Sequence, residues 1–219
     1  MLDSNKKIHM EYQLPKPRCQ TANPISTTIS KRRTHRDFSE QPANVEQLAS
    51  LLWAAQGQSS CATFRNTPSP GGQYAAEIHV AIVKNDLLPA GTYRYDVQQH
   101  ALEQTTHKAV SVELESAAIG DQSWVSTASI VVLIASDISS LNTHFEQQPP
   151  FGKRGERYAY IEAGTMVQNM ALIGEEVGIG GVIVGGFDDE KVATIFQLKP
   201  HLNPLALYCA GRINQPISD

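Results

Sequence analysis

The segment 31–36, with the sequence KRRTHR, carries four permanent cations within six residues. Such a cluster repels itself unless an anion or carboxylates neutralise it. Guanidinium groups present forked donors that match phosphate oxygens, and a hydroxyl adds a further hydrogen bond. A phosphomonoester therefore fits the segment, with the candidate ligands Arg32, Arg33, Thr34 and Arg36. The competing interpretation is a solvated positive helix end that the helix dipole favours, and the segment alone leaves both open.

Two glycine-containing segments could approach a flat ligand closely. The turn 68–72, PSPGG, combines rigid prolines with glycines that lack the Cβ that would hold a ligand away. Gly185 and Gly186 directly follow a predicted strand, and Arg212 closes the last predicted strand as a further phosphate donor. Each feature alone also suits an ordinary loop. The candidate residues of the turn are Pro68, Ser69, Pro70 and Gly71.

Other chemistries find little support. The sequence contains no G-x-x-x-x-G-K-[ST], H-E-x-x-H or G-x-S-x-G pattern, and its seven histidines lack metal-ligand spacing. Gly178-Ile179-Gly180 follows a helical pattern and precedes a strand, the reverse of the order in a dinucleotide-binding motif. The pairs Glu175-Glu176 and Asp188-Asp189 are assigned to a solvent-facing helix side and to an N-cap. We therefore predict no metal site and assign these acid pairs no catalytic role, and the catalytic residues stay unknown.

The composition fits a chain with a full hydrophobic core and no general affinity for polyanions. Of the 219 residues, 41% are hydrophobic, and the net charge is −4. Nucleic acid is therefore not an expected partner. Three widely spaced cysteines, Cys19, Cys61 and Cys209, argue against a disulfide scaffold, and no apolar run reaches the length of a secretion signal or a membrane span. We expect a reduced, cytoplasmic protein with no membrane partner.

The N-terminal half predicts an arm, a helix and several strands. Residues 1–24 are polar and proline-containing, which is typical of an extended arm, whereas 25–219 is expected to form a single domain. Asn44 and Gln47 resemble a capping pair for a helix that Gly57 would end in the left-handed conformation. Strand patterns occur at 77–84, 92–96, 101–103 and 129–135, with a small hairpin between the second and third.

In the C-terminal half, the segment 137–157 is too long for an ordinary connection. A lid or binding loop and a disordered surface loop are both open interpretations. The strongest helical period covers 158–177 and ends at Gly178. We expect a strand at 182–184, a helix at about 188–196 and a strand at 205–210. Helices and strands interleave without a strict βαβ order, so we predict an α+β fold with a mixed central sheet flanked by helices.

Taken in order, these segments resemble the nitroreductase family of flavoproteins, and within it the SagB-type dehydrogenase branch. The resemblance spans nearly the whole chain after the arm. It rests on KRRTHRDF at 31–38, LASLLWAAQG at 48–57, the PSPGG turn at 68–72, GTYRYD at 91–96, YAYIEAGTMVQNMAL at 158–172, EVGIGGVIVGGFDDEKV at 176–192 and AGR at 210–212.

The resemblance implies a homodimer that binds FMN at the subunit interface. The FMN phosphate, ribityl chain and pyrimidine edge would meet Arg32, Arg33, Thr34 and Arg36, with Arg212 at the phosphate. The isoalloxazine ring would lie against the backbone of Gly185 and Gly186. The partner subunit would contribute Pro68, Ser69, Pro70 and Gly71. NADH or NADPH would reduce the flavin, which would then reduce a nitroaromatic, quinone or similar small acceptor in a ping-pong cycle.

Departures from the family pattern bear on the substrate. Thr165 stands where SagB-like relatives often have histidine, and Arg157-Tyr158 stands roughly where azole-forming members would show a Lys-Tyr pair. Pro70 replaces a residue that is commonly small. The alternatives are an azoline dehydrogenase acting on a modified peptide and a non-catalytic flavin-binding protein. The physiological acceptor and the choice between NADH and NADPH do not follow from the sequence.

Overall fold

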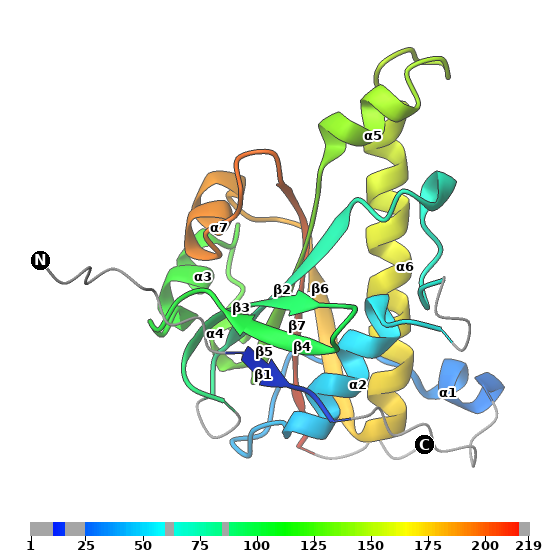
Figure 1. The fold of residues 1–219 in the computed structure, drawn as a ribbon. Helices are drawn as coiled ribbons and strands as arrows, with labels where there is room; N and C mark the ends of the chain where they lie inside the picture. The colour runs from blue at the N-terminus through cyan, green and yellow to red at the C-terminus, as the bar shows by residue number, and fades with distance from the viewer. Residues whose placement is uncertain (1–10, 16–24, 60–63, 85–87, 215–219) are drawn as a thin grey trace, which may run out of the picture.

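A seven-stranded sheet forms the centre of the protein in the computed structural model, which describes residues 11–15, 25–59, 64–84 and 88–214. The strand order is β1-β4-β3-β2-β5-β7-β6 (Figure 1). The strands are β1 (Glu11–Gln13), β2 (Ala76–Ile82), β3 (Gly91–Asp96), β4 (Ala101–Gln104), β5 (Ile130–Ser136), β6 (Ile179–Val184) and β7 (Asn203–Arg212). All their ladders are antiparallel, and the parallel component among the described residues is the isolated bridge between Thr34 and Gly181. The predicted α+β fold is confirmed.

Helices cover both faces of the sheet (Figure 1). Strand β5 shows why both faces need cover, because its side chains alternate between two buried clusters. Ile130, Val132 and Ile134 pack in the cluster beneath α2 (Val45–Gln56) and α6 (Arg154–Val177). Val131, Leu133 and Ala135 pack in the opposite cluster, which is covered by α3 (Ser111–Ala117), α4 (Trp124–Thr127) and α7 (Asp189–Ile195). The predicted doubly covered strand at 129–135 is therefore confirmed.

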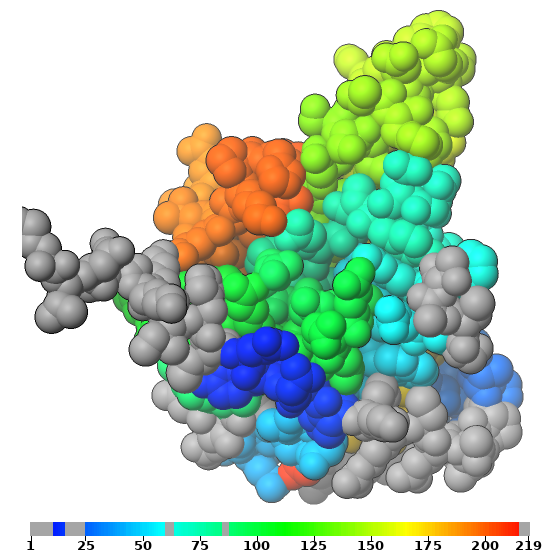
Figure 2. Space-filling view, viewed as in Figure 1, coloured from blue at the N-terminus to red at the C-terminus, as the bar shows by residue number. Residues whose placement is uncertain are grey.

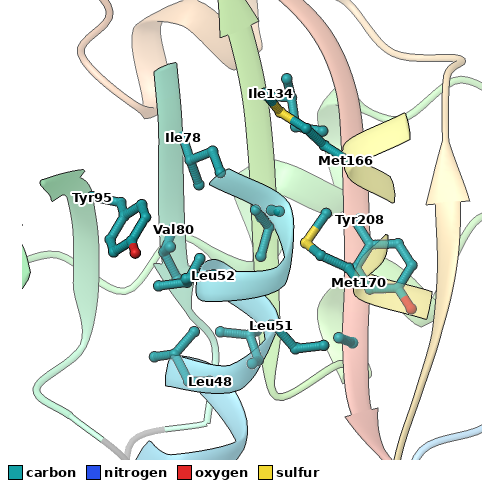
Figure 3. Close-up of a cluster of buried hydrophobic side chains, with 14 of the residues drawn as sticks. Leu48, Leu51, Leu52, Ile78, Val80, Tyr95, Ile134, Met166, Met170 and Tyr208 are labelled. Carbon is teal, nitrogen blue, oxygen red and sulfur yellow. The ribbon is translucent and has the colours of Figure 1, made fainter. Parts of the chain in front are cut away.

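The cluster beneath α2 and α6 holds these two helices against the sheet and against each other. Figure 3 shows side chains of both helices meeting those of the strands, and each residue labelled there is at most 4% exposed. Burying one large apolar side chain contributes roughly 1.5–3 kcal/mol. The cluster includes Leu48, Leu51 and Leu52 of α2, Met166 and Met170 of α6, and Ile78, Val80, Tyr95, Ile134 and Tyr208 of the sheet.

The ends of the two long helices follow local rules, with one exception. Asn44 accepts the backbone N–H of Gln47, whose side chain accepts the N–H of Asn44, so the predicted capping pair is confirmed. Gly178 ends α6 with φ at +76°, as predicted. The left-handed end predicted at Gly57 is wrong, because its φ is −60°. A Cβ there would lie 2.4 Å from Cδ1 of Trp53, so close packing explains this glycine.

The prediction of one long loop at 137–157 is wrong, because helix covers 138–144 and 154–157. Asp137 accepts the N–H of Ser140 and begins α5 (Ile138–His144). Helix α6 then begins at Arg154, before the predicted residue 158. A Cβ at Gly155 would lie 2.3 Å from the Asn142 nitrogen, so this glycine lets the two helices pack closely. Figure 2 shows that α5 and the first turns of α6 project beyond the body of the molecule.

Part of the predicted N-terminal arm packs on the sheet of its own chain. Strand β1 pairs with β4, and Leu14 is 9% exposed. The rest of the arm, 1–10 and 16–24, lies outside the described residues, as do Cys19 and Cys61. Across the described ranges, no helix combines the length and the apolar character that crossing a membrane requires.

Candidate functional site

The arginine segment runs along the outer edge of β6. Helix α1 (Ile25–Lys31) ends on the first residue of this segment. Thr34 forms a parallel bridge with Gly181, whose carbonyl accepts the N–H of His35 at 3.1 Å. The His35 ring packs on Gly180, where a Cβ would lie 2.6 Å from ring carbons. The glycines at the start of β6 therefore let the segment approach the sheet closely, and this explains a sequence that resembled part of a dinucleotide-binding motif.

A carboxylate on α6 anchors the same segment. Glu175 Oε1 accepts the backbone N–H of Arg33 at 3.1 Å and lies 3.8 Å from His35 Nε2. The side chain of Glu175 is 19% exposed. Its assignment to a solvent-facing helix side is therefore wrong, because it supplies negative charge and an acceptor to the arginine segment.

Two of the predicted phosphate ligands are engaged with neighbours of the same chain. The Arg33 guanidinium donates to the carbonyl oxygens of Ser30 at 2.7 Å and Arg32 at 3.0 Å. These carbonyls lie at the C-terminal end of α1, so the helix-end interpretation describes the Arg33 side chain. The Arg36 guanidinium carbon lies 5.2 Å from the centroid of the Trp124 ring, which is a cation–π contact.

The backbone pairing places Arg32, Thr34 and Arg212 near the first residues of β6, and we call this group the basic corner. Arg212 closes β7 opposite Ile179, and Thr34 bridges β6 two residues further on. Arg32 is partly buried and acts electrostatically on Tyr208, whose pKa is raised by burial and by Glu175 and lowered by Arg32. The basic corner thus combines two guanidinium groups and a hydroxyl, the donor types that bind a phosphomonoester.

Gly185 and Gly186 lie just beyond the opposite end of β6. Four residues at about 3.3 Å each place Gly185 about 13 Å from Gly181. The Gly186 carbonyl accepts from the backbone N–H of Ile119 at 2.9 Å and from Gln122 Nε2 at 3.1 Å. Gly185 is exposed, and among the described residues beyond its two chain neighbours a Cβ built on it meets no heavy atom within 4 Å. The backbone of Gly185 therefore faces open space that a flat ring could fill.

The PSPGG turn lies on α6, away from the basic corner of the same chain. Ser69 Oγ donates to Glu162 Oε2 at 3.1 Å. Glu162 precedes Glu175 by 13 residues on α6, which is about 20 Å along the helix. The turn contains the short helix η1 (Pro70–Gly72), in which Gly71 has φ at +60°. Among the described residues, about 20 Å of α6 therefore separates the turn from the basic corner.

Glu162 is a site residue that sequence reasoning missed. Its side chain is buried, with an exposed fraction of 2%, although it carries a carboxyl group. Burial raises the pKa of Glu162 to about 7, while the Ser69 hydrogen bond and the nearby charge of Arg65 lower it. The sequence offered one signal, because Glu162 lies three residues after Ala159 and four before Met166 on the predicted helix. The structure shows that both of these apolar residues are buried.

Two further missed residues support the turn. Asn169 Nδ2 donates to the Ala54 carbonyl and to Thr67 Oγ1, each at 3.1 Å, and so ties α6 to α2 and to the residue before the turn. The Arg65 guanidinium carbon lies 4.6 Å from the centroid of the Tyr74 ring, just after the turn. Within the described ranges, no three histidine, cysteine, aspartate or glutamate side chains gather as a metal site.

The fold and the site define an α+β sandwich with a basic corner and an open glycine at opposite ends of an edge strand. The chain belongs to the nitroreductase family, whose sequence model matches residues 29–212. It is therefore an oxidoreductase of that family. The match includes the arginine segment, the turn, all of α6 and the closing arginine.

Individual relatives agree with this assignment. The protein MJ1384 of Methanocaldococcus jannaschii, which is named as a nitroreductase, is 30% identical over 188 residues, covering 86% of this chain and 90% of that protein. A crystal structure from Ralstonia eutropha, also named as a nitroreductase, superposes with a TM-score of 0.76 at 28% identity, covering 94% and 90% of the two chains. A chain of the Escherichia coli microcin synthetase McbBCD complex, solved with truncated pro-MccB17 bound, shares the fold at 20% identity with a TM-score of 0.71, covering 92% and 77%.

Proposed function

We propose that this protein is an FMN-dependent oxidoreductase that accepts hydride from NADH or NADPH and reduces nitroaromatic, quinone or similar small acceptors. The observation that carries the proposal is the pairing of the basic corner with the open backbone of Gly185 along β6. An elongated cofactor with a phosphate at one end and a flat ring at the other suits this arrangement. Membership of the nitroreductase family supports the choice of a flavin.

In this proposal, the protein binds and tunes the cofactor, and bound FMN supplies hydride chemistry at N5. Arg32, Thr34 and Arg212 hold the phosphate, with Arg33 and Arg36 as the further candidates from the arginine segment. The backbone of Gly185 and Gly186 supports the ring. Nearby cations and backbone amides stabilise the negative charge that a reduced flavin carries. The chain therefore supplies anchoring, orientation and electrostatics.

The proposal includes a homodimer in which the turn of one copy serves the site of the other. The family resemblance of the PSPGG turn supports this, and within its own chain the turn lies about 20 Å along α6 from the basic corner. Large apolar side chains exposed on α6 and β6 are candidates for contacts with the partner. Tyr160 and Ile161 of α6 are 51% and 55% exposed, and Ile183 of β6 is 51% exposed.

A second candidate is a SagB-like dehydrogenase that oxidises azoline rings in a modified peptide. The fold shared with a chain of the microcin synthetase complex favours it. Two side chains weaken it. Thr165 donates to the backbone carbonyl of Glu162 at 2.7 Å, and Tyr158 donates to Gln148 at 2.7 Å, so both hydroxyls have local structural roles. Turnover of an azoline peptide, with none of a quinone, would favour this candidate.

The visible spectrum of the freshly purified protein tests the proposed function directly. We expect flavin absorbance, or its appearance after reconstitution with FMN, and oxidation of NADH or NADPH when a quinone or nitroaromatic acceptor is added. A yellow protein that no reduced nicotinamide bleaches would indicate a flavin-binding protein without turnover. A protein that stays colourless after reconstitution would refute FMN as the cofactor.

The substitution Gly185→Ala separates ring binding from folding. In the part of the chain that the structure describes, a new methyl group meets no heavy atom within 4 Å beyond its chain neighbours, so we expect an unchanged melting temperature for the flavin-free protein. FMN affinity should fall about tenfold or more, because the methyl group would occupy the space of the ring. Calorimetry of the flavin-free protein and titration with FMN measure the two effects. Equal FMN affinity in both proteins would show that the ring does not lie on Gly185.

A further inference from the structure

We propose that Glu162 is a positioning residue, which holds the Pro68–Gly71 turn in the shape that meets the flavin of the partner subunit. The inference rests on the proposed function, because it assumes that the turn of one copy completes the FMN site of the other. Glu162 would not touch the cofactor. It would act through Ser69.

The hydrogen bonds of Ser69 join the turn to α6. Ser69 Oγ donates to Glu162 Oε2 at 3.1 Å and accepts the backbone N–H of Tyr74 at 2.8 Å. One hydroxyl thus links the start of the turn, Tyr74 two residues after Gly72, and the helix behind it. The carboxylate fixes the direction of this hydroxyl, because an ionised carboxylate can only accept.

The backbone that Ser69 holds is unusual and needs such support. Gly71 and Gly72 have φ at +60° and +65°, and Tyr74 has φ at +49°. Positive φ is uncommon for a residue with a bulky side chain and persists only where its surroundings enforce it. The Tyr74 N–H is bound by Ser69, and its ring lies beneath the Arg65 guanidinium. Losing the Glu162 contact should therefore loosen this part of the chain first.

Burying the carboxyl group of Glu162 costs free energy unless an interaction of its charged form offsets that cost. The side chain is 2% exposed, and Oε1 is buried without a hydrogen-bond partner in the described part of the chain. A buried carboxylate destabilises a fold unless it is paired or hydrogen-bonded. An apolar side chain would pack α6 against the turn at lower cost. What the carboxylate adds is a charge-assisted hydrogen bond to Ser69, in the field of Arg65.

The charge of Glu162 should change near neutral pH, so the proposal predicts that FMN affinity depends on pH in this range. Burial raises the pKa of Glu162 to about 7, while Ser69 and Arg65 lower it. The groups that face this region are Arg65 before the turn, Tyr74 after it and Tyr95 on β3. Above pH 7 the carboxylate accepts strongly from Ser69, and below pH 7 the neutral acid accepts weakly. FMN affinity should therefore fall as the pH is lowered from 8 to 6.

The test compares FMN dissociation constants of wild-type protein, Glu162→Gln and Ser69→Ala at pH 6, 7 and 8. Because a phosphate monoester also titrates near pH 6, the quantity to follow is the ratio of variant to wild type. We expect Glu162→Gln to bind about fivefold more weakly than wild type at pH 8 and nearly equally at pH 6. Ser69→Ala should show the same pH-dependent loss of FMN affinity. The double variant should lose no more FMN affinity than either single variant.

The matched control is Glu156→Gln, which changes an exposed glutamate on the first turn of the same helix. Its ratio to wild type should stay near one at every pH. A ratio for Glu162→Gln that does not vary with pH, or a Ser69→Ala variant that keeps the wild-type pH dependence, would overturn the proposal.

Hydrogen exchange of the Tyr74 amide in flavin-free protein tests Glu162 without the cofactor. We expect faster exchange in Glu162→Gln than in wild type, because the Ser69 acceptor loses its fixed orientation. If wild-type protein binds no FMN but the Tyr74 amide still exchanges faster in Glu162→Gln than in wild type, the proposed function fails while Glu162 still orders the turn. Unchanged exchange together with unchanged FMN binding would mean that Glu162 has no positioning role.

Discussion

Replacing Arg32 and Arg212 together by alanine is expected to weaken FMN binding by a hundredfold or more, so that the variant purifies without flavin. Both residues belong to the basic corner. A hydrogen bond to a charged group contributes about 1.5–3 kcal/mol, so two such contacts correspond to roughly 3–6 kcal/mol, or about 10²- to 10⁴-fold in affinity. Titration of flavin-free protein with FMN, followed by fluorescence, measures the loss.

The matched control for the arginine variant replaces Lys153 and Lys199 by alanine. Both lysines are exposed, and the net charge changes by the same amount. We expect FMN affinity within about twofold of wild type, because exposed charges at a distance are screened by salt. If this control loses as much FMN affinity as the arginine variant, the loss comes from the change in net charge and not from contacts at the basic corner. If the arginine variant keeps its affinity, the phosphate does not bind at the basic corner.

Gly181→Ala is expected to lower the melting temperature by about 4–10 °C and to displace the arginine segment. The added Cβ would lie 2.4 Å from Cζ and Oη of Tyr208 and 2.9 Å from the Cys209 carbonyl. Tyr208 is 2% exposed, so its ring has little room to move. Overpacking of this kind costs about 1–3 kcal/mol, which for a chain of this size corresponds to a few degrees per kcal/mol. Calorimetry of flavin-free protein measures the shift.

Two further variants show whether the Tyr208 contact causes the loss. Gly185→Ala makes the same chemical change just beyond the same strand, but its Cβ meets nothing within 4 Å, so its melting temperature should match wild type. Adding Tyr208→Leu to Gly181→Ala should restore part of the lost stability, because the ring that the new methyl group meets is removed. A wild-type melting temperature for Gly181→Ala would contradict the close packing described here.

Local patterns explain which elements the sequence predicted well. The unbroken apolar run at 129–135 became β5, buried on both faces, because a strand covered by two layers needs apolar side chains in both directions. Alternation at 77–84 placed Ile78, Val80 and Ile82 in one cluster. The caps at Asn44 and Asp188 were also predictable, since both depend on contacts three residues away.

The features that were missed depend on contacts between distant residues. Glu175 meets Arg33 across 142 positions, and Glu162 meets Ser69 across 93, so local spacing gave no sign of either partner. The left-handed helix end at Gly57 was predicted from its place after a helix. The close approach of the Trp53 side chain explains instead why this residue is a glycine. Helix α5 was hidden because the prolines and glycines that follow it made the whole segment read as a loop.

Helix α6 has a consequence for how defects combine in the proposed dimer. Its C-terminal part anchors the arginine segment of its own site through Glu175, and its middle holds the turn that serves the other site through Glu162. A copy with a defective arginine segment therefore keeps a working turn, and a copy with a defective turn keeps its arginines. Mixing the two would gather both defects at one site and leave the other intact. Two inactive proteins would complement each other, because each mixed dimer would recover one of its two sites.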